Sequence, residues 1–294
     1  MANKPEVTGF HEPRTGSIQY VLADPATRRC AIIDPVLDFD ACSGATATRS
    51  ADAILDHVRE RGLRVDWIID THPHADHLSA AGYLKDRTGA PTVTGARVVA
   101  VQRIWKRIYG LDETFPADGS QWDRLLADGD RITVGELGVE AMLCPGHTLA
   151  SITLVSGDAA FIHDTLFMPD SGTARADFPG GDAAALWRSI GRILTLPDAT
   201  RLFTGHDYRP QGRSAAWEST VAEQRATNRH LQAATDEAAF VALRTARDQT
   251  LPMPGLMLLA LQVNIAGGRL PPPDAEGRRH LRLPLDALPG AGWR

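Results

Sequence analysis

The sequence contains few cysteines and nothing that resembles a secretory leader. Its three cysteines, Cys30, Cys42 and Cys144, include no Cys-x-x-Cys pair. An odd, scattered set argues against a disulfide framework and favours a reducing compartment. Residues 1–6 are polar and lack the apolar stretch of a signal peptide. We therefore expect a cytoplasmic protein.

The chain also lacks an excess of basic residues and a long hydrophobic run. Its formal net charge of -5 gives no general attraction to nucleic acid or to acidic membranes. The longest apolar stretch, residues 256–261, is far too short to span a bilayer. We expect neither nucleic acid nor a membrane as a partner. A hydrophobic fraction of 43% and a charged fraction of 23% are those of an ordinary globular protein.

The hydrophobic pattern predicts strands near both ends of the first 210 residues, with helices between them. Segments typical of strands are 17–22, 30–33, 65–69, 91–94, 132–134, 139–143, 151–156, 159–162 and 200–204. Segments typical of helices are 51–61, 78–85, 97–109, 186–195 and most of 217–250, with proline-rich coil beyond residue 271. This order favours a mixed α/β protein of four layers, an αββα sandwich. We expect residues 1–210 to form the main domain and residues 211–294 a helical extension packed on it.

Residues that commonly bind metals follow several of the predicted strands. Four of them lie within six residues of one another directly after the strand at 65–69, and three more each follow a later strand: His72, His74, Asp76 and His77, then His147, Asp164 and His206. Imidazole and carboxylate groups in this density are natural ligands of a divalent metal. A single histidine after a strand is more often a turn or capping residue. The repeated pattern indicates a metal site.

The same residues resemble a known family. His-Pro-His-Ala-Asp-His at 72–77, Pro-Gly-His-Thr at 145–148, Asp164 and Gly205-His206 resemble the metallo-β-lactamase superfamily. Within it, Arg-Ala-Asp-Phe at 175–178 and His-Asp-Tyr at 206–208 resemble the persulfide dioxygenases of the ethylmalonic-encephalopathy-protein type. The related glyoxalase II enzymes tend to have Arg-x-Phe-Glu and His-Glu-Tyr at these places.

The resemblance implies a metallo-β-lactamase fold, a reaction and a set of ligands. It implies one Fe(II) ion per chain, held by His72, His147 and Asp164, and oxidation of glutathione persulfide by O2 to sulfite. It implies that four further residues either orient the ligands from outside or form a vacant second metal site: His74, Asp76, His77 and His206. It also implies substrate contacts from Arg175, Tyr208 and Thr148. We expect Cys144 to be a packed core residue and His163 to point away from the metal.

Other functions remain open at this stage. The retained second ligand set would also suit a two-metal hydroxyacylglutathione hydrolase of the glyoxalase II kind, a lactonase, or a metal-binding or redox-sensing module without catalysis. Residues 168–174 lack the Gly-Cys-Gly that usually precedes the family arginine. The carrier thiol could therefore be coenzyme A, bacillithiol or a free persulfide in place of glutathione. The long tail after Tyr208 predicts a homodimer.

Overall fold

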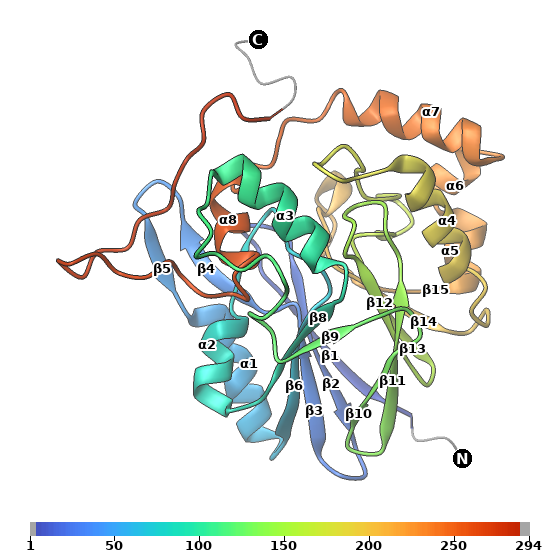
Figure 1. Cartoon of the computed structure of the whole chain (residues 1–294). Coiled ribbons are helices and arrows are strands. Elements are labelled where there is room, and N and C mark those ends of the chain that lie inside the picture. Colours follow the sequence, from blue (N-terminus) through green and yellow to red (C-terminus); the bar gives the residue numbers. More distant parts are fainter. Residues whose placement is uncertain (1–3, 289–294) are drawn as a thin grey trace.

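Two six-stranded sheets form the centre of the protein (Figure 1), as seen in a computed structural model that describes residues 4–288. The first sheet has the order β1 (Glu6–His11), β2 (Ile18–Asp24), β3 (Arg29–Ile33), β6 (Arg64–Asp70), β8 (Thr92–Gly95) and β9 (Arg124–Leu126). The second has the order β10 (Arg131–Val134), β11 (Leu137–Leu143), β12 (Ile152–Ser156), β13 (Ala159–His163), β14 (Arg201–Thr204) and β15 (Glu218–Thr220). A small third sheet joins β5 (Ala45–Ala47), β4 (Val36–Asp40) and β7 (Leu78–Ser79).

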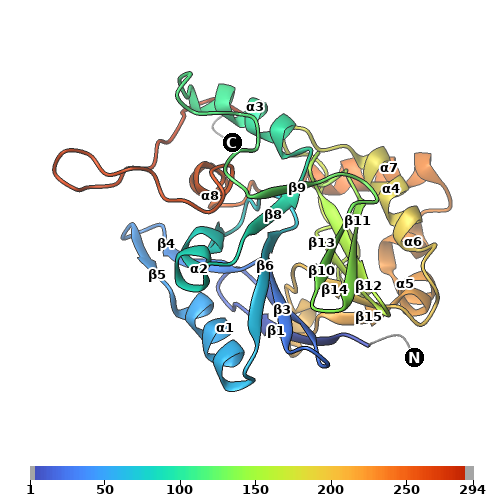
Figure 2. The same cartoon turned by 60° about the horizontal axis from the view of Figure 1, so that its bottom comes forward.

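Helices cover the outer faces of both large sheets (Figure 2). The first sheet is covered by α1 (Arg49–Glu60), α2 (Ala81–Thr88) and α8 (Met257–Asn264). The second is covered by α4 (Ala183–Ile193), α5 (Val221–Thr227), α6 (Arg229–Ala233) and α7 (Glu237–Asp248), while α3 (Val98–Tyr109) packs with α8. The predicted αββα arrangement is confirmed.

The alternation of side chains along β2 shows why the sheets pack in this way. Ile18, Tyr20 and Leu22 face the second sheet, where they meet Phe161 and Phe203 in one buried cluster. Val21 and Ala23, on the opposite face, belong to a different cluster on the helical side of the sheet. Because successive side chains of a strand point to opposite faces, a strand buried on both faces is largely apolar, and the buried Gln19 of β2 instead accepts from the N–H of Val36.

The structure differs from the sequence expectations mainly in short elements. The helix expected at 78–85 begins only at Ala81, since Leu78–Ser79 pairs with β4 instead. The helical stretch expected from Trp217 to about Thr250 begins with β15 and is divided into α5, α6 and α7. Strands β1, β4, β5 and β9 and helix α8 were not predicted.

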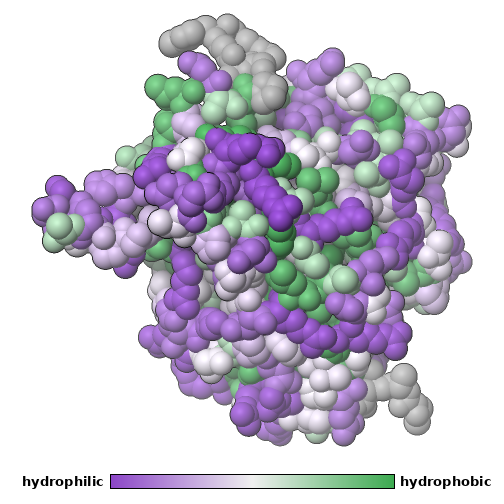
Figure 3. All heavy atoms as spheres, in the orientation of Figure 1, coloured by the Kyte–Doolittle hydropathy of each residue, from purple (hydrophilic) through white to green (hydrophobic). Residues whose placement is uncertain are grey.

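Helix α8 has no continuous polar face, and five of its eight residues are buried: Met257, Ala260, Leu261, Val263 and Asn264. Its mean apolar character follows from the stretch 256–261, and Met257 is fully buried whereas Met253 just before it is exposed. Among residues 4–288, no helix has the length and apolarity that crossing a membrane requires. On the face shown in Figure 3, apolar side chains form a band across the middle of the molecule, bordered by hydrophilic ones.

Candidate metal centre

The loop after β6 is held in place from two distant parts of the chain. The backbone N–H and the hydroxyl of Thr71 donate to Asp34, over 2.7 and 2.8 Å. From α8, the side-chain amide of Asn264 donates to the carbonyl oxygens of His74 and His77, over 2.7 and 2.8 Å. Buried polar groups that are all hydrogen-bonded make a stiff support. The histidines of this loop therefore start from a fixed backbone.

His72, His147 and Asp164 converge on one point at the end of a cavity. Oδ2 of Asp164 lies 4.0 Å from Nε2 of His72 and 3.5 Å from Nε2 of His147. All three residues are buried. They come from the ends of three strands, β6, β11 and β13, so the predicted strand-end residues are brought together as expected.

The other ring nitrogen of each histidine is bonded to the protein. Nδ1 of His147 donates to the carbonyl oxygen of Arg175 over 2.9 Å, and Nδ1 of His72 lies 3.1 Å from the hydroxyl of Thr71. These contacts leave Nε2 of each ring free, and Nε2 of His72 has no hydrogen-bond partner. Such outer contacts fix the ring orientation and the tautomer of a metal-binding histidine.

The charges at this point also suit a metal. Burial lowers the pKa of His72 and that of His147, so both rings stay neutral. Burial alone would raise the pKa of Asp164, but the nearby His206 lowers it to about 2 and keeps the carboxylate ionised. Two neutral imidazoles and one carboxylate are a common ligand set for divalent iron and for zinc. Ligands bound to one ion at about 2.1 Å lie roughly 3 to 3.5 Å apart, so the 3.5 and 4.0 Å separations here need a small inward shift. These residues fit a metal ion.

His74 belongs to the same motif but turns away from this point. Its Nε2 lies 3.0 Å from Oδ1 of Asp34, and its ring packs against that of His72 with centroids 4.1 Å apart. Burial would lower the pKa of His74, yet the charge and contact of Asp34 raise it to about 9. His74 is therefore paired with a carboxylate behind the metal position.

The ring of His206 connects the carboxylates of Asp76 and Asp164. Nδ1 of His206 lies 2.7 Å from Oδ1 of Asp164, and its Nε2 lies 2.5 Å from Oδ2 of Asp76. Burial would lower the pKa of His206, but the two carboxylates raise it well above its ordinary value. His77 completes this group, because its Nδ1 lies 3.1 Å from the same Asp76 oxygen. Of these residues, His206 contacts the Asp164 carboxylate, at the oxygen that does not face His72 and His147.

A cavity of about 550 Å³ opens beside the three converging residues. His147, Asp164 and Asp76 are among its lining residues, together with the aromatic rings of Phe167 and Phe178, whereas His72 is not. The lining also includes Arg175, Tyr208, His230, Arg244, Arg247 and Met253. A mostly apolar cavity with a few polar groups at defined places is typical of a small-molecule site.

Two of the three predicted substrate residues line this cavity. The guanidinium of Arg175 forms a two-bond ion pair with Asp177, donates to the carbonyl oxygen of Pro252, and lies 4.9 Å from the centroid of the Phe178 ring. Tyr208 is 59% exposed and stacks on His206 with centroids 5.6 Å apart. Thr148 is not part of the lining, and its hydroxyl lies 2.8 Å from that of Ser151.

Cys144 and His163 lie close to the three converging residues but belong to no candidate ligand group in the described part of the chain. Cys144 is fully buried among apolar residues, and burial raises the pKa of its thiol to about 11. His163 was expected to point away from the metal. Its φ of 37° interrupts the extended geometry of the strand at this residue. Its ring lies behind His72, with centroids 5.3 Å apart, and it belongs to none of the donor clusters found in residues 4–288.

Several residues around the site were not singled out from the sequence. Asp34 follows the apolar segment 30–33, so the rule that polar residues after a strand are functional could have found it. Ser17, Asn264 and Arg247 carry no such signal, because each reaches the site only through the tertiary fold.

Comparisons with known proteins identify the family of the chain. A sequence profile of the metallo-beta-lactamase superfamily matches residues 17–206. The chain is 66% identical over 289 residues to the beta-lactamase hydrolase-like protein of Xylella fastidiosa, a match that covers 98% of this chain and 67% of that relative. It is 32% identical over 266 residues to the mitochondrial persulfide dioxygenase ETHE1 of Bos taurus, covering 90% of this chain and 89% of that protein.

A solved structure shows the same fold over most of the chain. The crystal structure of ETHE1 from Myxococcus xanthus superimposes with a TM-score of 0.72 at 30% identity, covering 90% of this chain and 100% of that one. The profile match runs from Ser17 to His206 and therefore includes His72, His147 and Asp164. The chain belongs to the metallo-beta-lactamase superfamily and has ETHE1 persulfide dioxygenases among its homologues.

Proposed function

We propose that this chain is a persulfide dioxygenase that holds one Fe(II) ion with His72, His147 and Asp164. The observation that carries the proposal is that the donor atoms of His72, His147 and Asp164 converge, with Nε2 of both rings left for a metal. By contrast, both ring nitrogens of His206 contact carboxylates, and Nε2 of His74 lies 3.0 Å from Oδ1 of Asp34. Similarity to ETHE1 proteins supports the same assignment.

Fe(II) held on one face by two imidazoles and a carboxylate supplies redox chemistry and keeps positions free for two reactants. The chain's own groups prepare the site for this. Thr71 and the carbonyl of Arg175 hold the two histidine rings, and His206 holds Asp164. Phe167 and Phe178 keep the inner end of the cavity apolar. A water-poor site strengthens each of these electrostatic contacts.

The overall reaction balances with O2 as the only oxidant. A thiol persulfide, O2 and water give the thiol, sulfite and two protons. The terminal sulfur loses four electrons, which O2 accepts, and its bond to the carrier sulfur breaks. Two oxygen atoms of sulfite then come from O2 and one from water.

The cavity wall favours a carrier thiol with negative charge. Arg175 and Arg244 are each paired with an aspartate, Asp177 and Asp248. Arg247 lines the same cavity, and its guanidinium has no ion pair with any residue in 4–288. Arginine recognises carboxylates well, so we propose glutathione persulfide, whose carrier bears two carboxylates, as the first substrate to test.

A two-metal hydrolase is the second candidate, and one observation favours it. Asp76, Asp164 and His206 present donor atoms that lie within 4.8 Å of one another, a spacing that could hold an additional ion. The relative from Xylella fastidiosa is also named as hydrolase-like. Two metals that share a hydroxide would hydrolyse a thioester, without any need for O2.

Oxygen consumption distinguishes the two functions. The protein would be loaded with Fe(II) without air and then supplied with glutathione persulfide in an oxygen electrode, with sulfite measured in parallel. We expect rapid uptake with one sulfite per O2, lost in His147→Ala and kept in His280→Ala, which removes an exposed histidine far from the cavity. Hydrolysis of lactoylglutathione by a two-zinc form, with no oxygen uptake by the iron form, would replace this proposal by the hydrolase.

A further inference from the structure

The hydroxyl of Ser17 lies at the centre of the second group of ligand-type residues. Its oxygen is 2.9 Å from Oδ2 of Asp76, 3.1 Å from Nδ1 of His77 and 3.2 Å from Nε2 of His206. Ser17 is 2% exposed, so water does not compete for these contacts. One serine hydroxyl therefore occupies the space onto which an aspartate and two histidines converge.

The backbone fixes Ser17 in this place on both sides. Ser17 forms an antiparallel bridge with His206, and the flanking bonds run from Ile18 N–H to Gly205 O and from Asp207 N–H to Gly16 O, over 2.8 and 2.9 Å. Gly16 has a φ of 77°, in the left-handed region that glycine adopts without strain. This pairing fixes the backbone of Ser17 beside that of His206.

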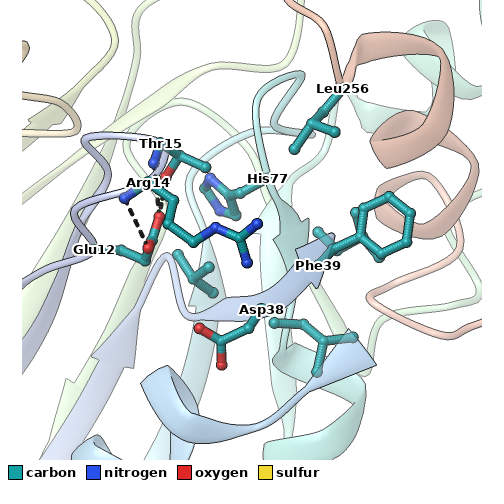
Figure 4. A pocket seen from close by; sticks show the side chains of 10 residues that line it. Glu12, Arg14, Thr15, Asp38, Phe39, His77 and Leu256 are labelled. Atoms are coloured by element: carbon teal, nitrogen blue, oxygen red, sulfur yellow. Dashed lines mark hydrogen bonds between the residues drawn. The ribbon is translucent and has the colours of Figure 1, made fainter. Parts of the chain in front are cut away.

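A second layer of hydrogen bonds supports the hydroxyl from outside. The hydroxyl of Thr15 lies 2.7 Å from that of Ser17 and 2.7 Å from Oε2 of Glu12. Glu12 also accepts from the backbone N–H groups of Arg14 and Thr15. Figure 4 shows Glu12, Arg14 and Thr15 together beside His77. Glu12 thus organises the turn between β1 and β2, which carries Thr15 and Ser17.

We propose that Ser17 keeps the chain to a single metal ion, by tying Asp76, His77 and His206 to its hydroxyl at hydrogen-bond spacing. Metal ligands must lie about 2.1 Å from a common ion, a position that the neutral serine oxygen already fills. The donor clusters found in residues 4–288 agree: one joins His77 to His74 and Asp76, another joins His206 to Asp76 and Asp164, and none contains both His77 and His206. This inference rests on the one-iron function proposed above.

Ser17 acts on the metal position as a positioning residue. It contacts His206, and His206 holds the outer oxygen of Asp164, whose inner oxygen faces His72 and His147. Removal of the hydroxyl would take one contact from each of three polar groups, although His77 and His206 would keep their contacts with Oδ2 of Asp76. The space left in this buried cluster would favour a water or an ion that restores the lost contacts. An added cation would satisfy all three at once.

Metal stoichiometry tests the proposal without any activity measurement. Metal-free wild type and Ser17→Ala would be dialysed against a low concentration of Zn(II), and bound metal would be counted by mass spectrometry. We expect one ion per chain in the wild type and two in Ser17→Ala, with the second ion bound at least tenfold more tightly than any second ion in the wild type. Ser156→Ala is the matched control, because it removes another buried hydroxyl in β12, far from the cluster.

Two further variants keep the test decisive if Ser17→Ala is unstable. Ser17→Thr retains the hydroxyl and should keep one ion. Thr15→Val leaves Ser17 in place but removes its support, so it should admit a second ion more weakly than Ser17→Ala. One ion per chain in both Ser17→Ala and Thr15→Val would overturn the proposal, and so would two ions in the wild type. Oxygen uptake by the wild type is measured separately, so the dioxygenase can stand while the role of Ser17 fails.

Discussion

The two sides of the histidine cluster use the same kinds of residue in opposite ways. On the cavity side, His72, His147 and Asp164 each have one polar atom bonded to the protein and one directed to a common point. On the interior side, His74 faces Asp34, and His206 lies between two carboxylates. The comparison teaches that a ligand motif defines which residues are available, while their hydrogen-bond partners decide which of them remain free to bind.

The largest expected effect is a difference in metal affinity between two variants, each of which removes a histidine from one side. We expect His147→Ala to lose its metal, with affinity reduced at least about 100-fold, whereas His74→Ala should retain one ion with affinity within about tenfold of the wild type. The physical reason is that His74 contacts Asp34 and the metal position is served by other donors. Metal content after gel filtration measures both. Equal loss of metal from the two variants would break the comparison.

The next largest effect concerns the stability of the interior side. Asp34→Ala leaves Thr71 and His74 buried without their carboxylate, which should lower the free energy of unfolding by about 3 to 5 kcal/mol. Asp34→Asn keeps an acceptor and should lose less. Urea denaturation measures both, with Asp56→Ala, which breaks an exposed ion pair, as the control within about 0.5 kcal/mol of the wild type. A small loss in Asp34→Ala would mean that the interior side does not depend on this carboxylate.

A smaller effect should appear as a pH dependence at the outer wall of the cavity. Burial and the nearby Arg244 lower the pKa of His230 to about 4, and its Nδ1 accepts from the N–H of Thr173 over 2.9 Å. Because the folded pKa lies below the unfolded value of about 6.5, this contribution to stability is complete above pH 6.5 and is lost as the pH falls toward 4.

His230→Gln removes the titrating group and tests this expectation. Partial exposure of the ring reduces the contribution to about 1 to 2 kcal/mol at pH 4, or a few degrees in Tm. Between pH 7 and pH 4.5 the wild type should therefore lose a few degrees more than the variant. Parallel melting curves of the two proteins over this range would contradict the assignment.

The smallest effect separates two of the predicted substrate residues. Arg175 lines the cavity, so Arg175→Met should raise KM about tenfold while kcat changes less than about threefold. Thr148 lies outside the lining with its hydroxyl on Ser151, so Thr148→Val should leave KM within about twofold. Steady-state kinetics with glutathione persulfide measures both. A larger change in KM for Thr148→Val would place the substrate on the other side of His147.

The sequence predicts the parts of this site that follow from local rules. Strands that end in histidine or aspartate bring His72, His147 and Asp164 to one edge of the sheets, and this much is visible in the hydrophobic pattern. The different orientations of His72 and His74 could not be predicted, because they depend on Asp34 at the end of another strand.

Elements whose stability comes from long-range contacts were missed for a similar reason. Helix α8 has no continuous polar face to give a helical period, and its Asn264 supports a loop nearly two hundred positions earlier in the chain. Ser17 is one polar residue at the start of an apolar strand, and only the pairing with His206 brings it to the cluster. Periodicity reports which face of an element is buried, but it carries no information on its partner.

Anomalous diffraction at the iron edge, on crystals of Fe(II)-loaded wild-type protein grown without air, tests the central claim most directly. The account predicts one peak per chain, at about 2.1 Å from Nε2 of His72, Nε2 of His147 and Oδ2 of Asp164. A peak located among Asp76, His77 and His206, alone or in addition, would contradict it.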